Sequence, residues 1–185
     1  MLTLGNLVCG ACATIALLTE SNFILAFWLV VASAIFDFFD GFAARLLKST
    51  SAIGVQLDSL ADMVSFGLVP SIAMYALWEQ LPQFVALPSW MQYLTLVIVA
   101  FSALRLAKFN VDELQTTSFR GLPIPANALF WIGICSWIHT HQYPGNTILI
   151  ILLIGMSFLM VTNLPMFSLK FKNFDWKENF KRYVI

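Results

Sequence analysis

Long apolar stretches separated by short polar segments dominate the pattern of this chain. They cover roughly residues 2–19, 23–48, 56–78, 90–111, 127–141 and 147–164. Most of them reach the ~20 residues that a helix needs to cross the hydrocarbon core of a bilayer. The stretch 127–141 is shorter, and we expect its helix to begin inside the preceding loop. The pattern therefore predicts an all-α membrane protein with six transmembrane helices.

The composition supports an integral, multi-pass membrane protein. Of the 185 residues, 59% are hydrophobic and 11% are charged, whereas about a quarter of the residues are charged in an ordinary soluble domain. The three cysteines lie in apolar stretches and suggest no disulfide framework. The net charge is zero, so it identifies no partner, and we expect no nucleic acid to bind. The first stretch lacks a basic flank and a cleavage pattern, so we expect no signal peptide.

The positive charges predict how the chain is oriented. With six spans both termini lie on one side of the membrane, and all ten Lys and Arg residues fall on that side. They are Arg45, Lys48, Arg105, Lys108, Arg120, Lys170, Lys172, Lys177, Lys181 and Arg182. Loops that stay in the cytoplasm keep an excess of Lys and Arg. We therefore expect both termini in the cytoplasm.

No polar linker, repeat or low-complexity run divides the sequence. We expect residues 1–165 to form one six-helix membrane domain and residues 166–185 to form a cytoplasmic tail. The tail mixes aromatic rings with five positive residues. Such a segment is typical of the lipid surface, where rings sink between head groups and cations meet anionic lipids.

Four acidic residues lie inside the apolar stretches, where charge is costly. Asp37 and Asp40 fall near the end of the second stretch, and Asp58 and Asp62 near the start of the third. Residues three or four apart share one face of a helix, so each pair forms a stripe. Since the connection between the two helices is short, it should bring the four carboxylates face to face.

Such a cluster needs compensation. One acid costs ~2.5 to 3.5 kcal/mol at a helix centre, so four cost on the order of 10 to 14 kcal/mol. Divalent cations offset this cost well, and Mg²⁺ is typically bound by a few carboxylates together with substrate phosphates. Gly41 and Ala44 leave room beside the first acidic pair, and Arg45 offers a phosphate contact one turn beyond. The pattern favours a diphosphate held across two ions.

The same acids fit other functions. An intramembrane acidic cluster can serve a proton relay, a divalent-cation transporter or a purely structural polar network. The glycine and the arginine within the stripe favour a phosphate substrate over a bare ion. Composition and spacing leave these alternatives open.

The spacing of these residues resembles a family signature. The pattern Asp-x2-Asp-Gly-x2-Ala-Arg-x8-Gly-x3-Asp-x3-Asp is met at every position by Asp37, Asp40, Gly41, Ala44, Arg45, Gly54, Asp58 and Asp62. It is the signature of the CDP-alcohol phosphotransferases. Further segments resemble the phosphatidylserine synthase branch of that family, namely residues 2–7, 57–67, 105–110 and 121–127.

The resemblance implies a homodimeric six-helix enzyme in a prokaryotic inner membrane. Two divalent metal ions, Mg²⁺ or Mn²⁺, would bind at a site that opens to the cytoplasm. By this likeness the metal ligands are Asp37, Asp40, Asp58 and Asp62, and Asp62 is also the catalytic general base. The reaction would transfer the phosphatidyl group of CDP-diacylglycerol to the hydroxyl of L-serine and release CMP. Glycerol 3-phosphate, an inositol phosphate, choline or an archaeal CDP-lipid remain alternatives as substrates.

The resemblance also predicts contacts to the CDP group. Gly41, Ala44 and Arg45 would line the CDP site, and Thr3 and Asn6 are further candidate polar contacts. One feature departs from the family pattern. Relatives often carry a Pro-Asn pair shortly before the threonine equivalent to Thr3, and here that pair would fall ahead of the first residue.

The carboxylate of L-serine needs a cation. A guanidinium fork matches a carboxylate better than a point charge does, so Arg105 is the first candidate. The other candidates near the same membrane face are Lys108, Asn110 and Arg120. Residues 121–125 contain two prolines and cannot continue a helix. We expect them to form a loop beside the mouth of the site.

Overall fold

The computed structural model describes residues 2–47, 51–80, 88–111, 121–141 and 144–162. The elements of this part of the chain are helical, in agreement with the predicted all-α class. They are α1 (Leu2–Glu20), α2 (Phe23–Leu46), α3 (Ala52–Asp62), the π-helical segment η1 (Met63–Leu68), α4 (Val69–Gln80), the 3₁₀ segment η3 (Ser89–Thr95), α5 (Leu96–Val111), α6 (Ile124–Thr140) and α7 (Asn146–Val161). The predicted tail, residues 166–185, lies outside the described residues.

Four helices are long and apolar enough to cross a membrane by length and composition. They are Leu2–Glu20, Phe23–Ala44, Ala52–Gln80 and Trp90–Val111. α7 is a shorter apolar helix of 16 residues, and α6 has 17 residues and begins at Ile124, inside the predicted loop. A multi-pass membrane protein is thus supported, whereas the count of six spans and the orientation stay predictions.

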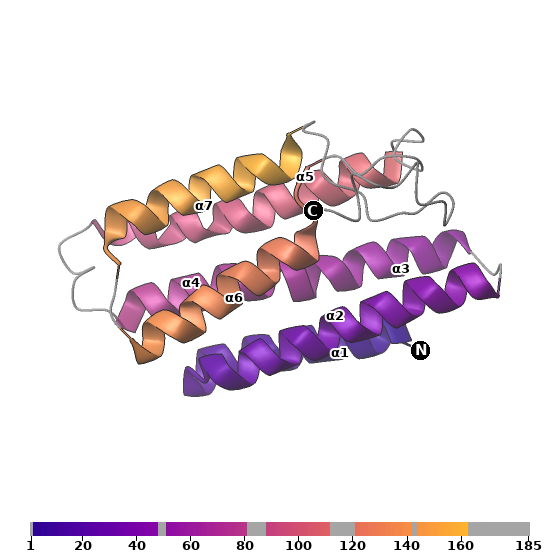
Figure 1. The fold of residues 1–185 in the computed structure, drawn as a ribbon, viewed down its shortest axis with the longest axis horizontal. Coiled ribbons are helices and arrows are strands. Elements are labelled where there is room, and N and C mark those ends of the chain that lie inside the picture. The colour runs from indigo at the N-terminus through magenta and orange to yellow at the C-terminus, as the bar shows by residue number, and fades with distance from the viewer. Residues whose placement is uncertain (1, 48–50, 81–87, 112–120, 142–143, 163–185) are drawn as a thin grey trace, which may run out of the picture.

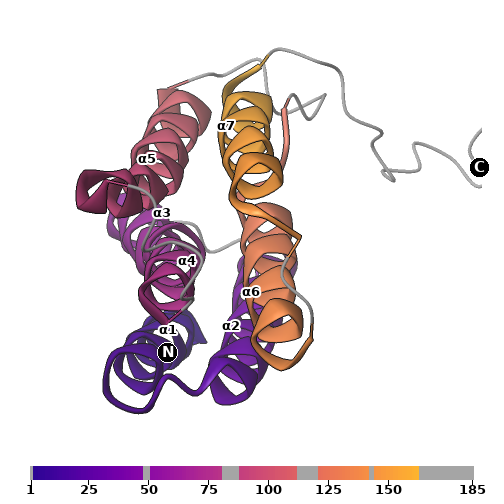
Figure 2. The ribbon, with the colours of Figure 1, turned by 90° about the vertical axis from the view of Figure 1, so that its left-hand side faces the viewer.

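The helices lie side by side along the long axis of the molecule (Figure 1). Seen from the end, α1 and α2 form one side of the bundle, α3, α4 and α6 the middle, and α5 and α7 the other side (Figure 2). α1 packs against both α2 and α3, α6 against α2 and α4, and α5 against α7. α1 thereby bridges the two helices that carry the acidic residues.

Apolar side chains fill the centre of the bundle and also cover its outside. Phe66, Met74 and Trp131 are fully buried, while Trp28 and Ile151 are more than half exposed. A helix that is apolar on all faces suits either a large core or a lipid environment. The exposed apolar residues are spread over the bundle, as expected for side chains that contact lipid.

Polar residues cap the N-terminal ends of the two helices that carry the acids. The side chain of Ser51 caps α3 and accepts the backbone N–H of Gly54 at 3.0 Å. Asn22 does the same for α2, with its Oδ1 3.0 Å from the backbone N of Leu25. Such caps satisfy N–H groups that have no partner within the helix. Since α2 ends at Leu46 and α3 begins at Ala52, the connection between them is short, as the sequence predicts.

The third long helix changes its winding immediately after Asp62. α3 ends there, and residues Met63–Leu68 follow as a π-helical segment before α4 begins. Short π-helical segments inside α-helices are rare and are frequent at functional sites. This segment rotates the remainder of the helix relative to the acidic stripe.

Candidate active site

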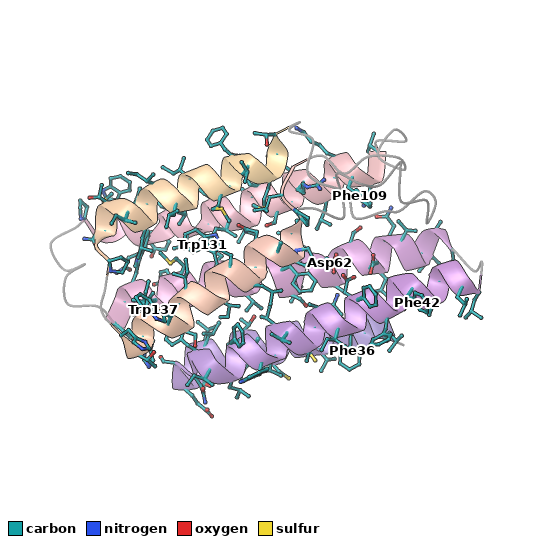
Figure 3. All side chains as sticks on the ribbon, viewed as in Figure 1. Phe36, Phe42, Asp62, Phe109, Trp131 and Trp137 are labelled. Carbon is teal, nitrogen blue, oxygen red and sulfur yellow. The ribbon has the colours of Figure 1, made fainter. Side chains whose placement is uncertain are left out.

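Three of the four predicted carboxylates converge. Asp37 from α2 and Asp58 and Asp62 from α3 each offer an oxygen, and these oxygens lie within 4.8 Å of one another. Each of the three side chains is partly buried, and Asp62 lies beside the start of α6 (Figure 3). Three of the four carboxylates that were expected to lie face to face therefore do so, whereas Asp40 is not part of this group.

The donor set fits a hard divalent cation. Oxygen ligands of Mg²⁺ lie about 2.1 Å from the ion, so two ligands of one ion lie at most about 4.2 Å apart. The observed spread of 4.8 Å is close to this limit. Carboxylate oxygens are the ligands that Mg²⁺ and Mn²⁺ prefer. Small side-chain movements would close the cluster around a cation.

Asp40 occupies a neighbouring position. Its Oδ2 accepts a hydrogen bond from the hydroxyl of Thr3 on α1. It lines a cavity of about 200 Å³ together with Thr3, Gly41, Ala44, Ser51, Gly54, Val55 and Asp58. A side chain built at Gly41 would have nothing within 4 Å, so the helix backbone is open to a ligand there. Three of the residues predicted to contact CDP thus share one cavity, and the side chain of Arg45 lies outside the described structure.

A second cavity lies on the other side of Asp58. It measures about 270 Å³ and is lined by Asp37, Asp58, Asp62, Arg105, Leu106, Phe109, Pro123, Ile124 and Pro125. Asp58 lines both cavities. Pro123, Ile124 and Pro125 form part of the wall, so the segment predicted beside the mouth of the site does line it. The loop prediction is wrong for Ile124 and Pro125, which lie in the first turn of α6, where a proline is tolerated because its missing N–H has no partner within the helix.

Arg105 is the described cation of this second cavity. It is only 6% exposed, and its Nε donates to the backbone oxygen of Leu122 at 3.3 Å. This bond ties the guanidinium to the loop that precedes α6. A buried guanidinium and three carboxylates thus line the same cavity, which gives it groups of both charges, as an amino acid ligand requires.

The other predicted serine contacts are not among the lining residues of this cavity. Lys108 Nζ donates to the backbone oxygen of Val161 at 3.4 Å, at the end of α7. Asn110 Nδ2 donates to Ser59 Oγ at 2.9 Å, between α5 and α3. Arg120 lies outside the described residues. Within the described part of the chain, the structure therefore separates Arg105 from the other candidates.

Asn6 lies behind the carboxylate cluster. It is fully buried, and its Nδ2 donates to Asp62 Oδ1 at 2.9 Å. It is not among the residues that line the cavity with Thr3. The sequence suggested a contact to the CDP group, whereas the structure shows a contact to an acidic residue of the cluster.

An apolar helical bundle with a carboxylate cluster at the junction of two cavities defines a membrane protein with a candidate metal centre. Comparison with known proteins makes this more specific. Residues 1–167 match the family model described as CDP-alcohol phosphatidyltransferase. The chain therefore belongs to this family, and it is a phosphatidyltransferase enzyme. Among the functions that composition and spacing left open, family membership therefore supports an enzyme.

Several curated relatives are similar over most of their length. A CDP-diacylglycerol–serine O-phosphatidyltransferase of Bacillus subtilis (strain 168) is 35% identical over 165 residues, which cover 89% of this chain and 86% of the relative. A protein of the same name from Helicobacter pylori is 36% identical over 172 residues, covering 89% and 68%. Another from Methanocaldococcus jannaschii is 38% identical over 162 residues, covering 88% and 69%.

Proposed function

We propose that this protein transfers the phosphatidyl group of CDP-diacylglycerol to the hydroxyl of L-serine, giving phosphatidylserine and CMP. The names of the curated relatives support the two substrates. The observation that carries the proposal is the second cavity, which Arg105 and three carboxylates line together. Its guanidinium can bind the carboxylate of serine, and its carboxylates can accept the proton of the serine hydroxyl.

The acidic residues would hold the divalent metal. Asp37, Asp58 and Asp62 form the cluster, and Asp40 is the proposed fourth ligand. When bound, two Mg²⁺ or Mn²⁺ ions supply charge neutralisation for the diphosphate and for the departing CMP. Family membership and the oxygen-only donor set support this assignment.

The cavity beside Asp40 is the proposed CDP site. Gly41 and Ala44 leave the surface of α2 open, while Thr3 and Ser51 line the same space. Arg45, one turn beyond Gly41 in sequence, is proposed to contact a phosphate. Because Asp58 lines both cavities, a diphosphate spanning them would reach from the nucleotide to the acceptor.

Arg105 and Asp62 are proposed to bind and activate L-serine. The guanidinium would hold the serine carboxylate through paired hydrogen bonds. This orientation would direct the hydroxyl toward Asp62, which lines the same cavity. A general base must lie within hydrogen-bond reach of the proton that it removes. Lys108, Asn110 and Arg120 are kept as proposals for a supporting role near this face.

The proposed reaction is a single displacement at phosphorus. The serine oxygen forms a bond to the phosphorus that carries diacylglycerol, and the bond from this phosphorus to the oxygen of CMP breaks. The bonding electrons leave with CMP, and Asp62 accepts the proton of the serine hydroxyl. In-line geometry is the usual requirement for such transfers, and the two cavities meeting at Asp58 suit it.

We also propose six membrane spans with both termini in the cytoplasm of a prokaryotic cell, the inner membrane as the location, and a homodimer. α6 and α7, with 17 and 16 residues, would be about 24 to 26 Å long. This is slightly short of a ~30 Å hydrocarbon core, and local thinning or tilted neighbours accommodate such a mismatch. The membrane domain would comprise residues 1–165, with the tail 166–185 on the lipid surface.

The test is CMP release by the purified chain in lipid nanodiscs with CDP-diacylglycerol and Mg²⁺ or Mn²⁺. L-serine, glycerol 3-phosphate, inositol phosphate and choline are supplied separately, with water alone as the blank. We expect strong CMP release with serine only. Faster release with another alcohol would overturn the acceptor, and no release above the blank with any alcohol would overturn the reaction.

A further inference from the structure

A buried asparagine connects the carboxylate cluster to two buried hydroxyl groups, one through its side chain and one through its backbone. Asn6 on α1 donates from Nδ2 to Asp62 Oδ1 at 2.9 Å. On its other side, Ser33 of α2 donates to Asn6 Oδ1. Ser65 of η1 donates to the backbone oxygen of Asn6 at 3.0 Å. All three residues outside the cluster, Asn6, Ser33 and Ser65, are fully buried.

These contacts determine which way the amide points. An ionised carboxylate only accepts hydrogen bonds, so Asn6 must turn its NH₂ group toward Asp62. Its amide oxygen then faces Ser33, which has one hydroxyl hydrogen to donate. That hydrogen also lies within reach of the backbone oxygen of Asn6, at 2.9 Å from Ser33 Oγ. Rotation of the amide would place its oxygen against the carboxylate and is therefore disfavoured.

Close backbone packing makes this arrangement rigid. A Cβ atom built at Gly10, one turn after Asn6 on α1, would lie 2.3 Å from Ser65 Oγ and 2.8 Å from Ser65 Cα. Only a glycine lets α1 and η1 approach so closely. Since η1 begins directly after Asp62, the contact fixes the position of the helix turn that follows the carboxylate.

We propose that Asn6 is a positioning residue that holds Asp62 in the orientation needed for the metal centre, and that Ser33 and Ser65 hold Asn6. This rests on the proposed function, in which Asp62 is a metal ligand and the general base. It assigns Asn6 to the support of the metal centre instead of the CDP site. Residues that hydrogen-bond to metal ligands orient them, and their loss typically weakens metal affinity or activity by about 10- to 100-fold.

The first test measures Mn²⁺ binding without substrate. The full-length purified chain is titrated with Mn²⁺, and free Mn²⁺ is followed by electron paramagnetic resonance. We expect Asn6→Ala to weaken binding at least about tenfold. Ser71→Ala is the matched control, because Ser71 is also a fully buried serine with a backbone acceptor, Thr95 O at 2.9 Å, in α4 and η3. We expect its Mn²⁺ affinity to stay within about twofold of wild type.

The second test asks whether the serine acts through the amide. Ser33→Ala should weaken Mn²⁺ binding less than Asn6→Ala does, and it should have no further effect in an Asn6→Ala background. Non-additivity of this kind is the signature of residues in one network. If Asn6→Ala does not yield folded protein, the comparison of Ser33→Ala with Ser71→Ala decides. Equal Mn²⁺ affinity of these two variants would then overturn the proposal.

Other results are equally decisive. Wild-type Mn²⁺ affinity in Asn6→Ala, or fully additive effects in the double variant, would overturn the positioning role. A raised KM for CDP-diacylglycerol with unchanged Mn²⁺ affinity would assign Asn6 to the nucleotide instead. Because the Mn²⁺ titration uses neither lipid nor serine, its result does not depend on the CMP-release assay with different alcohols. Wild-type protein that binds Mn²⁺ yet releases no CMP would overturn the proposed reaction only.

Discussion

At the scale of single residues, the cost of the acidic cluster explains its surroundings. The three carboxylate oxygens lie within 4.8 Å of one another, and two unit charges at that separation repel each other by about 3.5 kcal/mol at an effective dielectric constant of about 20. The described hydrogen-bond donors to the acids, Asn6 and Thr3, are neutral and do not balance this charge. A divalent cation is the simplest physical remedy, which is why the cluster favours metal chemistry.

The role of Asp62 as general base can be tested by removing its charge with little change in shape. Asp62→Asn should lower kcat at least about 100-fold, since positioned bases contribute 10²- to 10⁴-fold. At saturating Mg²⁺, binding of CDP-diacylglycerol should change little, because the proposed CDP cavity does not include Asp62 and the other three proposed metal ligands remain. CMP release and binding of radiolabelled CDP-diacylglycerol are measured in parallel. Glu79→Gln, an exposed acid at the far end of α4, is the control, and near-normal turnover in Asp62→Asn would remove the residue from this role.

The role of Arg105 concerns one substrate only. Arg105→Ala should raise the KM for serine about tenfold or more, because a charge-assisted hydrogen bond to a carboxylate is worth about 1.5 to 3 kcal/mol. Arg105→Lys should have an intermediate effect, because a point charge replaces the paired donors. The KM for CDP-diacylglycerol is measured alongside and should change little. An unchanged KM for serine in Arg105→Ala would contradict the assignment.

At the scale of helices and loops, one residue, Leu122, links α7 to Arg105 of the proposed serine site. The backbone N of Leu122 donates to Leu159 O at 3.0 Å, and its backbone O accepts from Arg105 at 3.3 Å. Gly121, directly before it, has φ of 72°. A Cβ at Gly121 would lie 2.6 Å from Met160 O and 2.8 Å from Thr162 O. The end of α7 thereby determines where the guanidinium lies.

Gly121→Ala should disturb this link. It adds both an unfavourable positive φ and a collision with backbone oxygens that cannot move away cheaply. Gly145→Ala is the matched control, since Gly145 also has a positive φ, 102°, with nothing within 4 Å of the built Cβ. The control should itself lose about 1 to 3 kcal/mol of unfolding free energy, because φ 102° with ψ 151° is a conformation that essentially only glycine adopts. Thermal unfolding and the KM for serine are measured for both variants. Gly121→Ala should have the lower unfolding temperature and the higher KM. Equal values for the two variants would show that the contact with α7 is unimportant.

At the scale of the whole molecule, the acidic cluster lies at one end of the bundle, and Glu20 and Glu79 lie at the other end. α1 runs from Thr3, which contacts Asp40, to Glu20, and the long third helix runs from Asp58 to Glu79. All positive residues of the sequence fall on the side of the acids if there are six spans. By the positive-inside rule we therefore propose that the end of the bundle that carries the acids faces the cytoplasm.

Thiol labelling in intact cells tests this orientation. The three natural cysteines are first replaced by alanine, and single cysteines are introduced as Glu20→Cys, Glu79→Cys and Leu47→Cys. A membrane-impermeant maleimide should label the first two from outside, whereas Leu47→Cys, near the catalytic end, should react only after lysis. Labelling of Leu47→Cys in intact cells, with protection of the other two, would reverse the orientation.

Much of the site could be predicted from local sequence, and the reason is geometric. Helical periodicity fixes which residues share a face, so the spacing alone pairs Asp37 with Gly41 and Asp58 with Asp62. The predicted bounds of the third stretch, 56–78, are also within a few residues of the observed ones, since α3 begins at Ala52 and α4 ends at Gln80. The all-α class and membrane character follow from apolar stretch length. None of these inferences requires knowledge of a distant contact.

Only the packed bundle decided the contacts between distant parts of the chain. Asn6 is 56 residues from Asp62, and no periodicity relates them. The same holds for Arg105, which the fold brings to the cavity while Lys108 donates to the end of α7. The separation of Asp40 from the other three acids depends on how α1 lies between α2 and α3. Backbone hydrogen bonding within a helix is local, whereas these choices depend on how all the helices pack together.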